Sequence, residues 1–325
     1  MTKKRNKTSP VIIILIIILV CLTVFSGFKV IDALFSTTEA PTVTTHKTVT
    51  LNGEEYFPRQ DITVMMLMGI DERGPVKASS SYTNTGEADM VALAVFDEVE
   101  ETYSVLVLNR DTMMNIPVLG IGGIPAGTMY GQLALSHTYG TGLEDSCENT
   151  VTAVSDFLSG LTVDYYISMN MDAISILNDA VGGVTVNVQD DFSQVDASIP
   201  KGEVTLNGDQ ALAYVHTRKD VGNQMNISRM DRHKEYMESF VKAFNNKLNE
   251  DSMFVLDIYD DVAQYIVSDC SVNTLSSMLD KYSQYKLEDI VSPKGENILT
   301  EQYMEFHVDE DALDKLIIDM FYIKK

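Results

Sequence analysis

The central sheet of this chain can be traced from residues 61–71, which read DITVMMLMGID. The run is almost continuously apolar up to residue 70. A short run of this kind, ending in Gly-Ile-Asp, is typical of a strand that is buried on both faces. Asp71 is the first charged residue after the run. We therefore predict a buried strand with a carboxylate at its carboxyl end.

Two further apolar runs, at residues 90–96 and 103–108, are separated by an acidic segment, and this spacing predicts a hairpin. If the first strand runs parallel to the third, Asp71, Asp89 and the pair Arg110 and Asp111 meet at one edge of the sheet. Such edges are where α/β proteins usually bind ligands. Two carboxylates near arginines suit Mg²⁺ bound to phosphate. The alternative is that these Asp residues are solvated turn formers.

The rest of the chain alternates between helical and strand patterns. Helices are predicted at 146–158, 172–181, 208–216, 229–248 and 309–321, and short strands at 184–188 and 204–206. Asn207 and Gln210 form a capping-box pattern at the start of the third helix. The glycine-rich segment 120–127 lacks the context of a nucleotide-binding turn and is expected to be a flexible loop. We predict one α/β domain over residues 60–325, with a mixed central β-sheet flanked by helices.

The amino-terminal region predicts an exported, membrane-anchored protein. Residues 11–28 carry no charge and are just long enough to span a bilayer. Four basic residues precede them, which places residues 1–10 in the cytoplasm. Residues 29–59, rich in Ser and Thr, are expected to form an extracellular linker. A cleaved signal peptide is the alternative. We favour an uncleaved single-pass anchor in the cell membrane, because signal cores are usually ~7–15 residues long.

Composition narrows the possible functions. The chain has 47 acidic residues against 24 Lys and Arg, a formal charge of −23, which disfavours nucleic acid as a partner. Three cysteines cannot build a disulfide scaffold, and Cys147 and Cys270 either pair or remain buried thiols. The motifs GxSxG, HExxH, CxxC and GxxxxGK are absent from the sequence.

A second candidate site lies in residues 217–234, a locally basic segment of this acidic chain. Arg229, Arg232 and His233 share one face at the start of the predicted helix 229–248. Helix amino termini attract anions, and arginine forks suit phosphate oxygens. We favour an anion site over the alternative, a surface network of Arg and Asp side chains. His137 is either a core residue or a site residue.

Several motifs occur in order: GIDER at 69–73, ADM at 88–90, NRDT at 109–112, LTVDYY at 161–166, VGGV at 181–184 and LNGDQALAYV at 206–215. Arg218 and the helix with Arg229 and Arg232 follow. Together they resemble the LytR–CpsA–Psr family of cell-wall glycopolymer transferases, and the likeness covers nearly all of residues 60–325. A membrane span with the domain outside is also the layout of that family.

The resemblance implies a hydrophobic pocket for a polyprenyl pyrophosphate lipid. It also implies a reaction that moves a glycopolymer from this carrier to a peptidoglycan hydroxyl, with hydrolysis of the pyrophosphate as a side activity. Asp71 and Asp89 would hold Mg²⁺. The phosphate-binding side chains would be Arg73, Arg110, Arg218, Arg229 and Arg232. Arg110, Asp89 and Asp111 would form the catalytic group. Asp111 either orients Arg110 or accepts the hydroxyl proton, and we favour the first role because the neighbouring arginine lowers its basicity.

Two positions depart from the family pattern. His216 stands where the family has Arg, and His233 stands where it has Gln. The first change replaces a permanent charge with an imidazole whose charge depends on pH, so we expect pyrophosphate binding to weaken as that ring loses its proton. The alternative function is a non-catalytic surface protein, a scaffold or sensor that binds polyprenyl phosphate or wall polymer. A more distant one is an exported binding domain for soluble anionic sugars.

Overall fold

The computed structural model describes residues 48–217 apart from 52, residues 261–324 with nine gaps, and scattered positions from 221 to 254. The nine gaps are 272, 273, 275, 276, 279, 280, 283, 284 and 302. The predicted cytoplasmic tail 1–10, the membrane span 11–28 and most of the linker 29–59 lie outside the described residues. None of the described helices is both long and apolar enough to cross a membrane.

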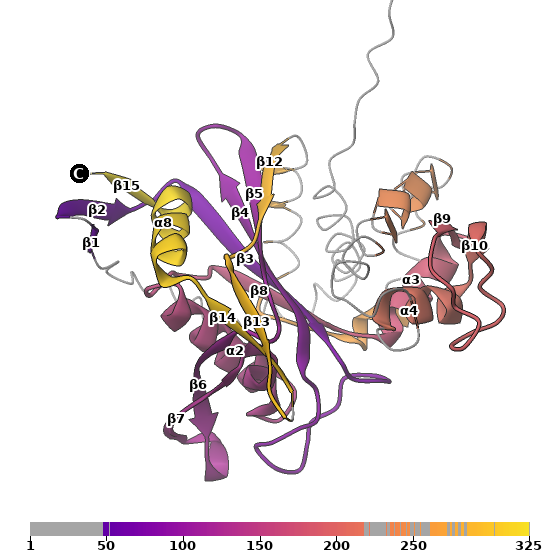
Figure 1. The fold of residues 1–325 in the computed structure, drawn as a ribbon, viewed down its shortest axis with the longest axis horizontal. Coiled ribbons are helices and arrows are strands. Elements are labelled where there is room, and N and C mark those ends of the chain that lie inside the picture. Colours follow the sequence, from indigo (N-terminus) through magenta and orange to yellow (C-terminus); the bar gives the residue numbers. More distant parts are fainter. Residues whose placement is uncertain are drawn as a thin grey trace, which may run out of the picture.

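The main sheet is mixed and has six strands among the described residues (Figure 1). In spatial order they are β11 (Ile266–Ser268), β8 (Tyr165–Asn170), β3 (Ile62–Ile70), β4 (Ala88–Asp97), β5 (Thr102–Leu108) and β12 (Lys286–Val291). The strands β3, β4 and β5 form an antiparallel meander, and β8 and β12 pair in parallel on either side of it. The predicted strand, hairpin and parallel orientation of the first and third strands are confirmed.

Side-chain alternation along β3 divides its apolar residues between two cores. Val64, Met66 and Met68 pack into a cluster with helix α2 (Glu144–Phe157) and helix α8 (Glu310–Phe321). Met65 and Leu67 point to the opposite face, where the partners include Met278, Tyr282 and Tyr285. Both faces are therefore covered, as a nearly continuous apolar strand requires.

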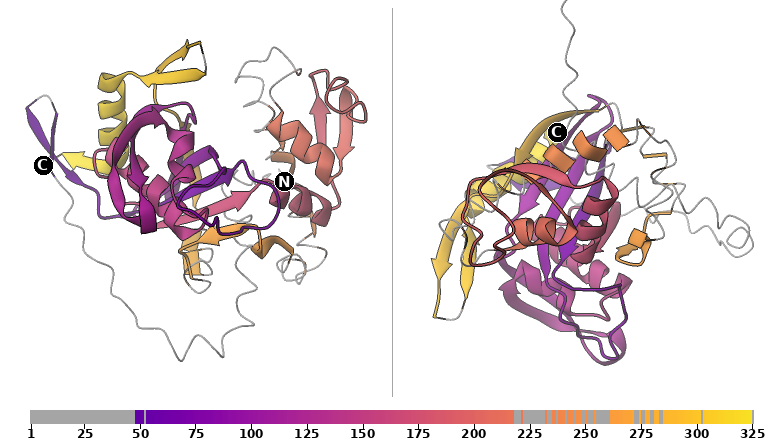
Figure 2. Two further views of the ribbon diagram at one scale, coloured as in Figure 1. Left: turned by 90° about the horizontal axis from the view of Figure 1, so that it is seen from below. Right: turned by 90° about the vertical axis from the view of Figure 1, so that its right-hand side faces the viewer.

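A second lobe has its own hydrophobic core. It comprises helix α3 (Asp172–Ala180), helix α4 (Gly208–His216) and the antiparallel pair β9 (Val184–Val188) and β10 (Gly202–Leu206). Figures 1 and 2 show this lobe on one side of the main sheet, away from the end that carries the carboxyl terminus. The predicted capping box is present: the Asn207 side chain accepts from the Gln210 N–H, and the Gln210 side chain accepts from the Asn207 N–H.

The small sheets lie around the main one. They are the hairpin β6 (Met113–Leu119) and β7 (Pro125–Gln132), the hairpin β13 (Gly295–Leu299) and β14 (Met304–Val308), and the sheet β1 (Val49–Leu51), β2 (Glu54–Pro58) and β15 (Tyr322–Lys324). Residues 49–58 of the predicted linker thus belong to the domain, because β2 pairs with β1 and β15.

Other sequence predictions differ in detail. The expected flexible loop 120–127 contains the short 3₁₀ helix Ile121–Gly123 and the first residues of β7, so it is the turn of a hairpin. Helix α2 begins two residues before the predicted start, and α8 begins after its cap, Asp309. The first residues of the predicted helix 229–248 lie outside the described residues.

Candidate active site

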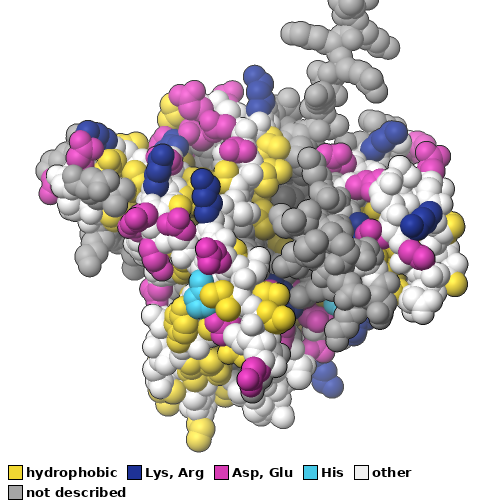
Figure 3. Space-filling model, in the orientation of Figure 1, with side chains coloured by type: hydrophobic (Ala, Val, Ile, Leu, Met, Phe, Trp, Pro, Cys, Tyr) yellow, Lys and Arg dark blue, Asp and Glu magenta, His cyan; other side chains and the backbone are white. Residues whose placement is uncertain are grey.

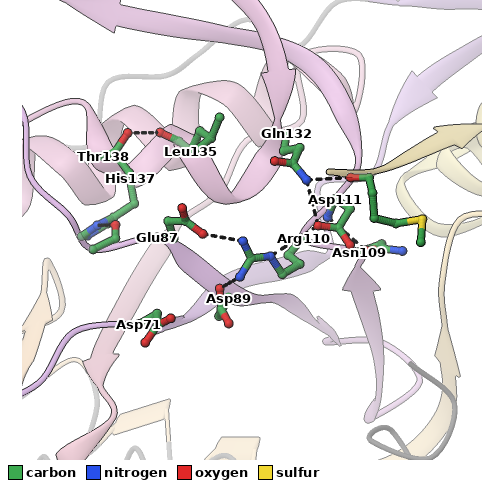
Figure 4. Close-up of polar contacts among 12 residues, drawn as sticks. Asp71, Glu87, Asp89, Asn109, Arg110, Asp111, Gln132, Leu135, His137 and Thr138 are labelled. Atoms are coloured by element: carbon green, nitrogen blue, oxygen red, sulfur yellow. Dashed lines mark hydrogen bonds and ion pairs between the residues drawn. The ribbon is translucent and has the colours of Figure 1, made fainter. Parts of the chain in front are cut away.

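Three strand ends meet at one edge of the main sheet, as the strand order predicts (Figure 4). Asp71 follows β3, Asp89 lies near the start of β4, and Arg110 follows β5. The Arg110 guanidinium donates one hydrogen bond to the Asp89 carboxylate and another to that of Glu87. It is therefore fixed as a fork between two acids of the neighbouring strand.

The backbone around Glu87 sets the positions of the two aspartates. A bulge shifts the pairing of β3 with β4, so that Gly69 faces Met90 while Ile70 faces Ala88. Asp89 is the extra residue of this bulge, a feature that re-aims side chains near active sites. The Glu87 carbonyl accepts hydrogen bonds from the Asp71 N–H (2.8 Å) and the Asp89 N–H (3.0 Å). One carbonyl thus holds both aspartates.

Asp111 lies behind Arg110 and is almost fully buried. Its Oδ1 accepts a hydrogen bond from Gln132 Nε2 (2.9 Å), and the same nitrogen donates to the Met304 carbonyl (2.8 Å). Arg110 Nε is 3.5 Å from Asp111 Oδ1, and among the described residues this buried nitrogen has no hydrogen-bond partner. Asp111 thus lies close enough to Arg110 to act on it by charge, and the orienting role favoured from the sequence stays a prediction.

His216, the last residue of α4, reaches this edge from the second lobe. Its Nε2 is 3.7 Å from Asp71 Oδ1. One ligand atom from each of Asp71, Asp89 and His216 lies within 4.8 Å of the others, close enough for a metal ion to draw them together. The two predicted metal ligands, Asp71 and Asp89, are therefore adjacent, and His216 lies beside them.

Arg232 corrects an expectation. Its guanidinium is buried, and it bonds to Asp190 (2.7 Å) and to the carbonyls of Tyr214 (3.0 Å) and Thr217 (2.6 Å). All three of its nitrogens are used within the protein, so Arg232 secures the end of α4 and is not presented to a phosphate. Arg218, Arg229 and His233 lie outside the described residues.

Arg73 and His137 each have a partner other than the aspartate pair. The exposed Arg73 pairs with Asp172 at the start of α3 (2.6 Å). His137 is buried, and its Nδ1 donates to the Gly86 carbonyl (2.8 Å), next to Glu87. Burial lowers the pKa of His137, so its ring is neutral and supports the loop as a core residue.

Neither of the two described cysteines is placed as a nucleophile. Cys147 and Cys270 are free thiols. Burial raises the pKa of Cys147 to about 12, and its Sγ lies 3.8 Å from His137 Nε2. A neutral thiol is a poor nucleophile, so the pair Cys147 and His137 is packing, not a catalytic dyad.

A groove opens beside the aspartate pair. It runs between the loop 72–86 and the end of β8, and its lining includes Glu72, Ser79, Thr83, Asn84 and Asn170. The lining is mostly polar, so this groove differs from the apolar lipid pocket that the family resemblance implies. On the face shown in Figure 3, acidic side chains are spread over the described surface without forming one patch.

Two residues of this site were missed from the sequence. Glu87 lies just before β4, and the bulge at Asp89 breaks the two-residue period of the strand, so no regular strand pattern marks Glu87. Gln132 follows Asp111 by 21 residues and reaches it only through the hairpin β6–β7, which carries no strong sequence signal.

The chain is similar in sequence to known proteins. The LytR_cpsA_psr family model matches residues 28–320. The polyisoprenyl-teichoic acid–peptidoglycan teichoic acid transferase TagU of Bacillus subtilis (strain 168) is 30% identical over 241 residues, 74% of this chain and 67% of the relative. TagU of Bacillus licheniformis is 30% identical over 223 residues, 68% of this chain and 63% of the relative. The chain thus spans about two thirds of these relatives.

Solved structures show the same fold. TagT bound to LI-WTA superposes with a TM-score of 0.58 at 23% identity, covering 80% of this chain and 90% of that one. The mixed sheet and the lobe that supplies His216 therefore belong to a known architecture. Because the family model matches most of the chain, the protein belongs to the LytR–CpsA–Psr family.

Proposed function

We propose that the protein is a cell-wall glycopolymer transferase. It moves an anionic glycopolymer from a polyprenyl pyrophosphate carrier to a peptidoglycan hydroxyl. The observation that carries the proposal is the fixed guanidinium of Arg110, bound to Asp89 and Glu87 beside Asp71. The names of the TagU relatives support the substrate and acceptor classes.

The charges at this edge explain why a cation is needed. Asp71, Glu87, Asp89 and Asp111 outnumber Arg110 four to one among the described side chains there. A pyrophosphate brought to this edge alone would be repelled by the acids. The carboxylate pair fits a divalent cation, since Asp71 and Asp89 offer oxygens within 4.8 Å of each other. When bound, that ion, Mg²⁺ in the family, would offset the acids and stabilise charge on the phosphate oxygens.

The protein's own side chains then stabilise the charge that develops on the phosphate and hold one another in position. Arg110 is held rigidly, so its guanidinium can face charge that develops on the leaving phosphate without reorganising. Asp111 keeps Arg110 in place from its buried position, where Gln132 engages one of its oxygens. Water in place of the acceptor would give hydrolysis as the side activity.

The polar groove beside Asp71 suits the acceptor. The exposed side chains of Lys77 and Thr83 line it, and ammonium and hydroxyl groups pair well with sugar hydroxyls. The lipid chain would occupy the apolar pocket that the family resemblance implies. We further propose that residues 11–28 anchor the protein in the cell membrane, with the domain outside, where carrier and peptidoglycan meet.

Turnover tests this function. The full chain in detergent is incubated with a polyprenyl-pyrophosphate oligosaccharide, a glycan acceptor and Mg²⁺. We expect acceptor-linked product and released polyprenyl phosphate, both lost in Asp89→Asn. Asp97→Asn is the matched control, because Asp97 lies at the other end of β4 and also binds an arginine. Tight binding of the carrier without release would favour the non-catalytic scaffold instead.

A further inference from the structure

His216 is the third residue of the cluster with Asp71 and Asp89, and it distinguishes this site from the family pattern. It stands where the family pattern has arginine, and it comes from α4 in the second lobe while Asp71 and Asp89 come from the main sheet. Its Nε2 is 3.7 Å from Asp71 Oδ1, and all three ligand atoms lie within 4.8 Å of one another. An imidazole nitrogen and two carboxylates therefore face one point.

Hydrogen bonds hold the backbone that carries each of the three side chains. The Glu87 carbonyl accepts the N–H groups of both Asp71 and Asp89. The end of α4 is secured because Arg232 bonds to the carbonyl oxygens of Tyr214 and Thr217, on either side of His216. Contacts in the main sheet and at the end of α4 therefore bring the three side chains together.

The site is open enough to load a metal. The side chains of His216 and Asp71 are 44% and 43% exposed, whereas that of Asp89 is 10% exposed and bonds to Arg110. Around one ion at about 2.0–2.2 Å from each ligand atom, neighbouring ligand atoms lie roughly 3–3.5 Å apart. Rotation of the two half-exposed side chains is enough to close the remaining difference.

The donor set determines which metal is preferred. Mg²⁺ takes oxygen ligands almost exclusively and keeps its waters, so an imidazole adds little to its binding. First-row transition metals accept imidazole nitrogen together with carboxylate oxygen. We propose that Asp71, Asp89 and His216 bind a first-row transition-metal dication in preference to Mg²⁺. This deepens the proposed function, since the same ion would meet the pyrophosphate.

Manganese is the probe for this proposal. The full chain in detergent is stripped with a chelator and titrated with Mn²⁺, and free Mn²⁺ is followed by electron paramagnetic resonance. We expect one tight site, with Mg²⁺ competing at least about tenfold more weakly. Pulsed spectra of the bound Mn²⁺ should show coupling to an imidazole ¹⁴N.

Three variants test which side chains bind the metal. His216→Gln should remove the ¹⁴N coupling and weaken Mn²⁺ binding by about tenfold or more, while Mg²⁺ binding changes by less than about threefold. Asp71→Asn should weaken both metals. His307→Gln is the matched control, since His307 also faces a carboxylate, Glu305 (2.6 Å), but lies on β14. It should leave the coupling and both affinities unchanged.

The outcomes of these experiments distinguish the metal-site proposal from the proposed transferase function. Absence of ¹⁴N coupling in the unmutated protein, or an unchanged Mn²⁺ to Mg²⁺ ratio in a folded His216→Gln variant, would overturn the metal assignment. Either result leaves the transferase proposal standing if lipid-linked substrate still turns over. Metal binding as described without turnover would keep the metal site and reject the transferase.

Discussion

Arg110 and Arg59 are bound alike at opposite ends of β4. Each guanidinium bonds to two carboxylates, Arg110 to Glu87 and Asp89, and Arg59 to Asp61 and Asp97. The difference is location, since Arg110 lies at the edge where the strand ends and His216 gather. The pair allows the contribution of a fixed guanidinium to catalysis to be separated from its contribution to stability.

Arg110→Lys should reduce the rate of polyprenyl phosphate release by about 10²–10³-fold, because a lysine cannot form the fork that presents a fixed charge to the phosphate. The rate is measured under single-turnover conditions at saturating substrate. Arg59→Lys should change it by less than about threefold. Equal losses in both variants would mean that Arg110 acts only through stability.

The pKa values of Asp269 and Asp61 are shifted in opposite directions, so the two residues should change the free energy of unfolding with pH in opposite directions. Burial raises the pKa of Asp269 above its ordinary value of 3.8, whereas the Arg59 hydrogen bond lowers that of Asp61. The folded state therefore loses stability at Asp269 as pH rises from 3.8 through the raised pKa. At Asp61 it gains stability above 3.8 and loses it as pH falls.

Asp269→Asn should therefore raise the free energy of unfolding near neutral pH, since an amide oxygen can still accept the Tyr166 N–H that Asp269 accepts at 2.8 Å. Asp61→Asn should lower it there. Both differences should shrink at acid pH, because carboxyls of the unfolded chain bind protons below about 3.8 and the ion pair of Asp61 is lost as pH falls further. Urea unfolding at the two pH values measures this, and the same sign for both variants near neutrality would refute the assignment.

Some strands and helices can be predicted from their sequence, and others cannot. Strand β3 and the capping box of α4 were predictable because their signals are local: an unbroken apolar run and a pair of side chains three residues apart. Hairpin β6–β7 was not, because it contains Pro117 and much of β7 is solvent-exposed, which removes the apolar alternation. The meeting of Asp71, Asp89 and Arg110 followed from strand order alone.

The contacts between lobes could not be read from the sequence. The basic segment 217–234 predicts Arg232 as a phosphate ligand, yet the buried side chain bonds to Asp190, which is 42 residues away in the chain. The approach of His216 to Asp71 likewise depends on how the two lobes pack, which no local pattern encodes. Long-range pairing of polar groups is set by tertiary structure.

The turn after α3 offers a matched pair of glycines. Gly182 and Gly183 both have positive φ, +84° and +90°. A Cβ on Gly183 would lie 2.8 Å from Thr205 Cγ2 and 2.9 Å from the Leu206 carbonyl oxygen, whereas on Gly182 the nearest described atom would be Lys247 Cε at 3.8 Å. Gly182→Ala should cost about 1–2 kcal/mol, and Gly183→Ala clearly more, since backbone must move. Equal losses in urea unfolding would contradict this.

The described part of the molecule has two lobes: the main sheet, with a hydrophobic core on each face, and the second lobe, with a core of its own. The three-residue cluster spans both, because Asp71 and Asp89 belong to the first and His216 to the second. An ion bound there would connect the lobes by coordination, so its binding free energy would add to the stability of their packing.

Mn²⁺ at about a hundred times its dissociation constant should therefore stabilise the folded protein by about 2.7 kcal/mol and raise its melting temperature. Calorimetry of the full chain in detergent measures the shift. In Asp71→Asn the shift should largely vanish, and in His307→Gln it should persist. A shift of the same size in Asp71→Asn would place the stabilising ion elsewhere.

The small sheet at the far end brings distant parts of the chain together. Val49 of β1 and Lys324 of β15 both pair with Tyr56 of β2, from opposite sides. Neighbouring strands lie about 4.8 Å apart, so residues 49 and 324 are roughly 10 Å apart, a span that a few glycines can bridge. The domain is thus suited to circular permutation: strands β1 and β15 could be fused and new termini opened in the exposed tip of β6–β7, leaving the edge with Asp71, Asp89 and Arg110 intact.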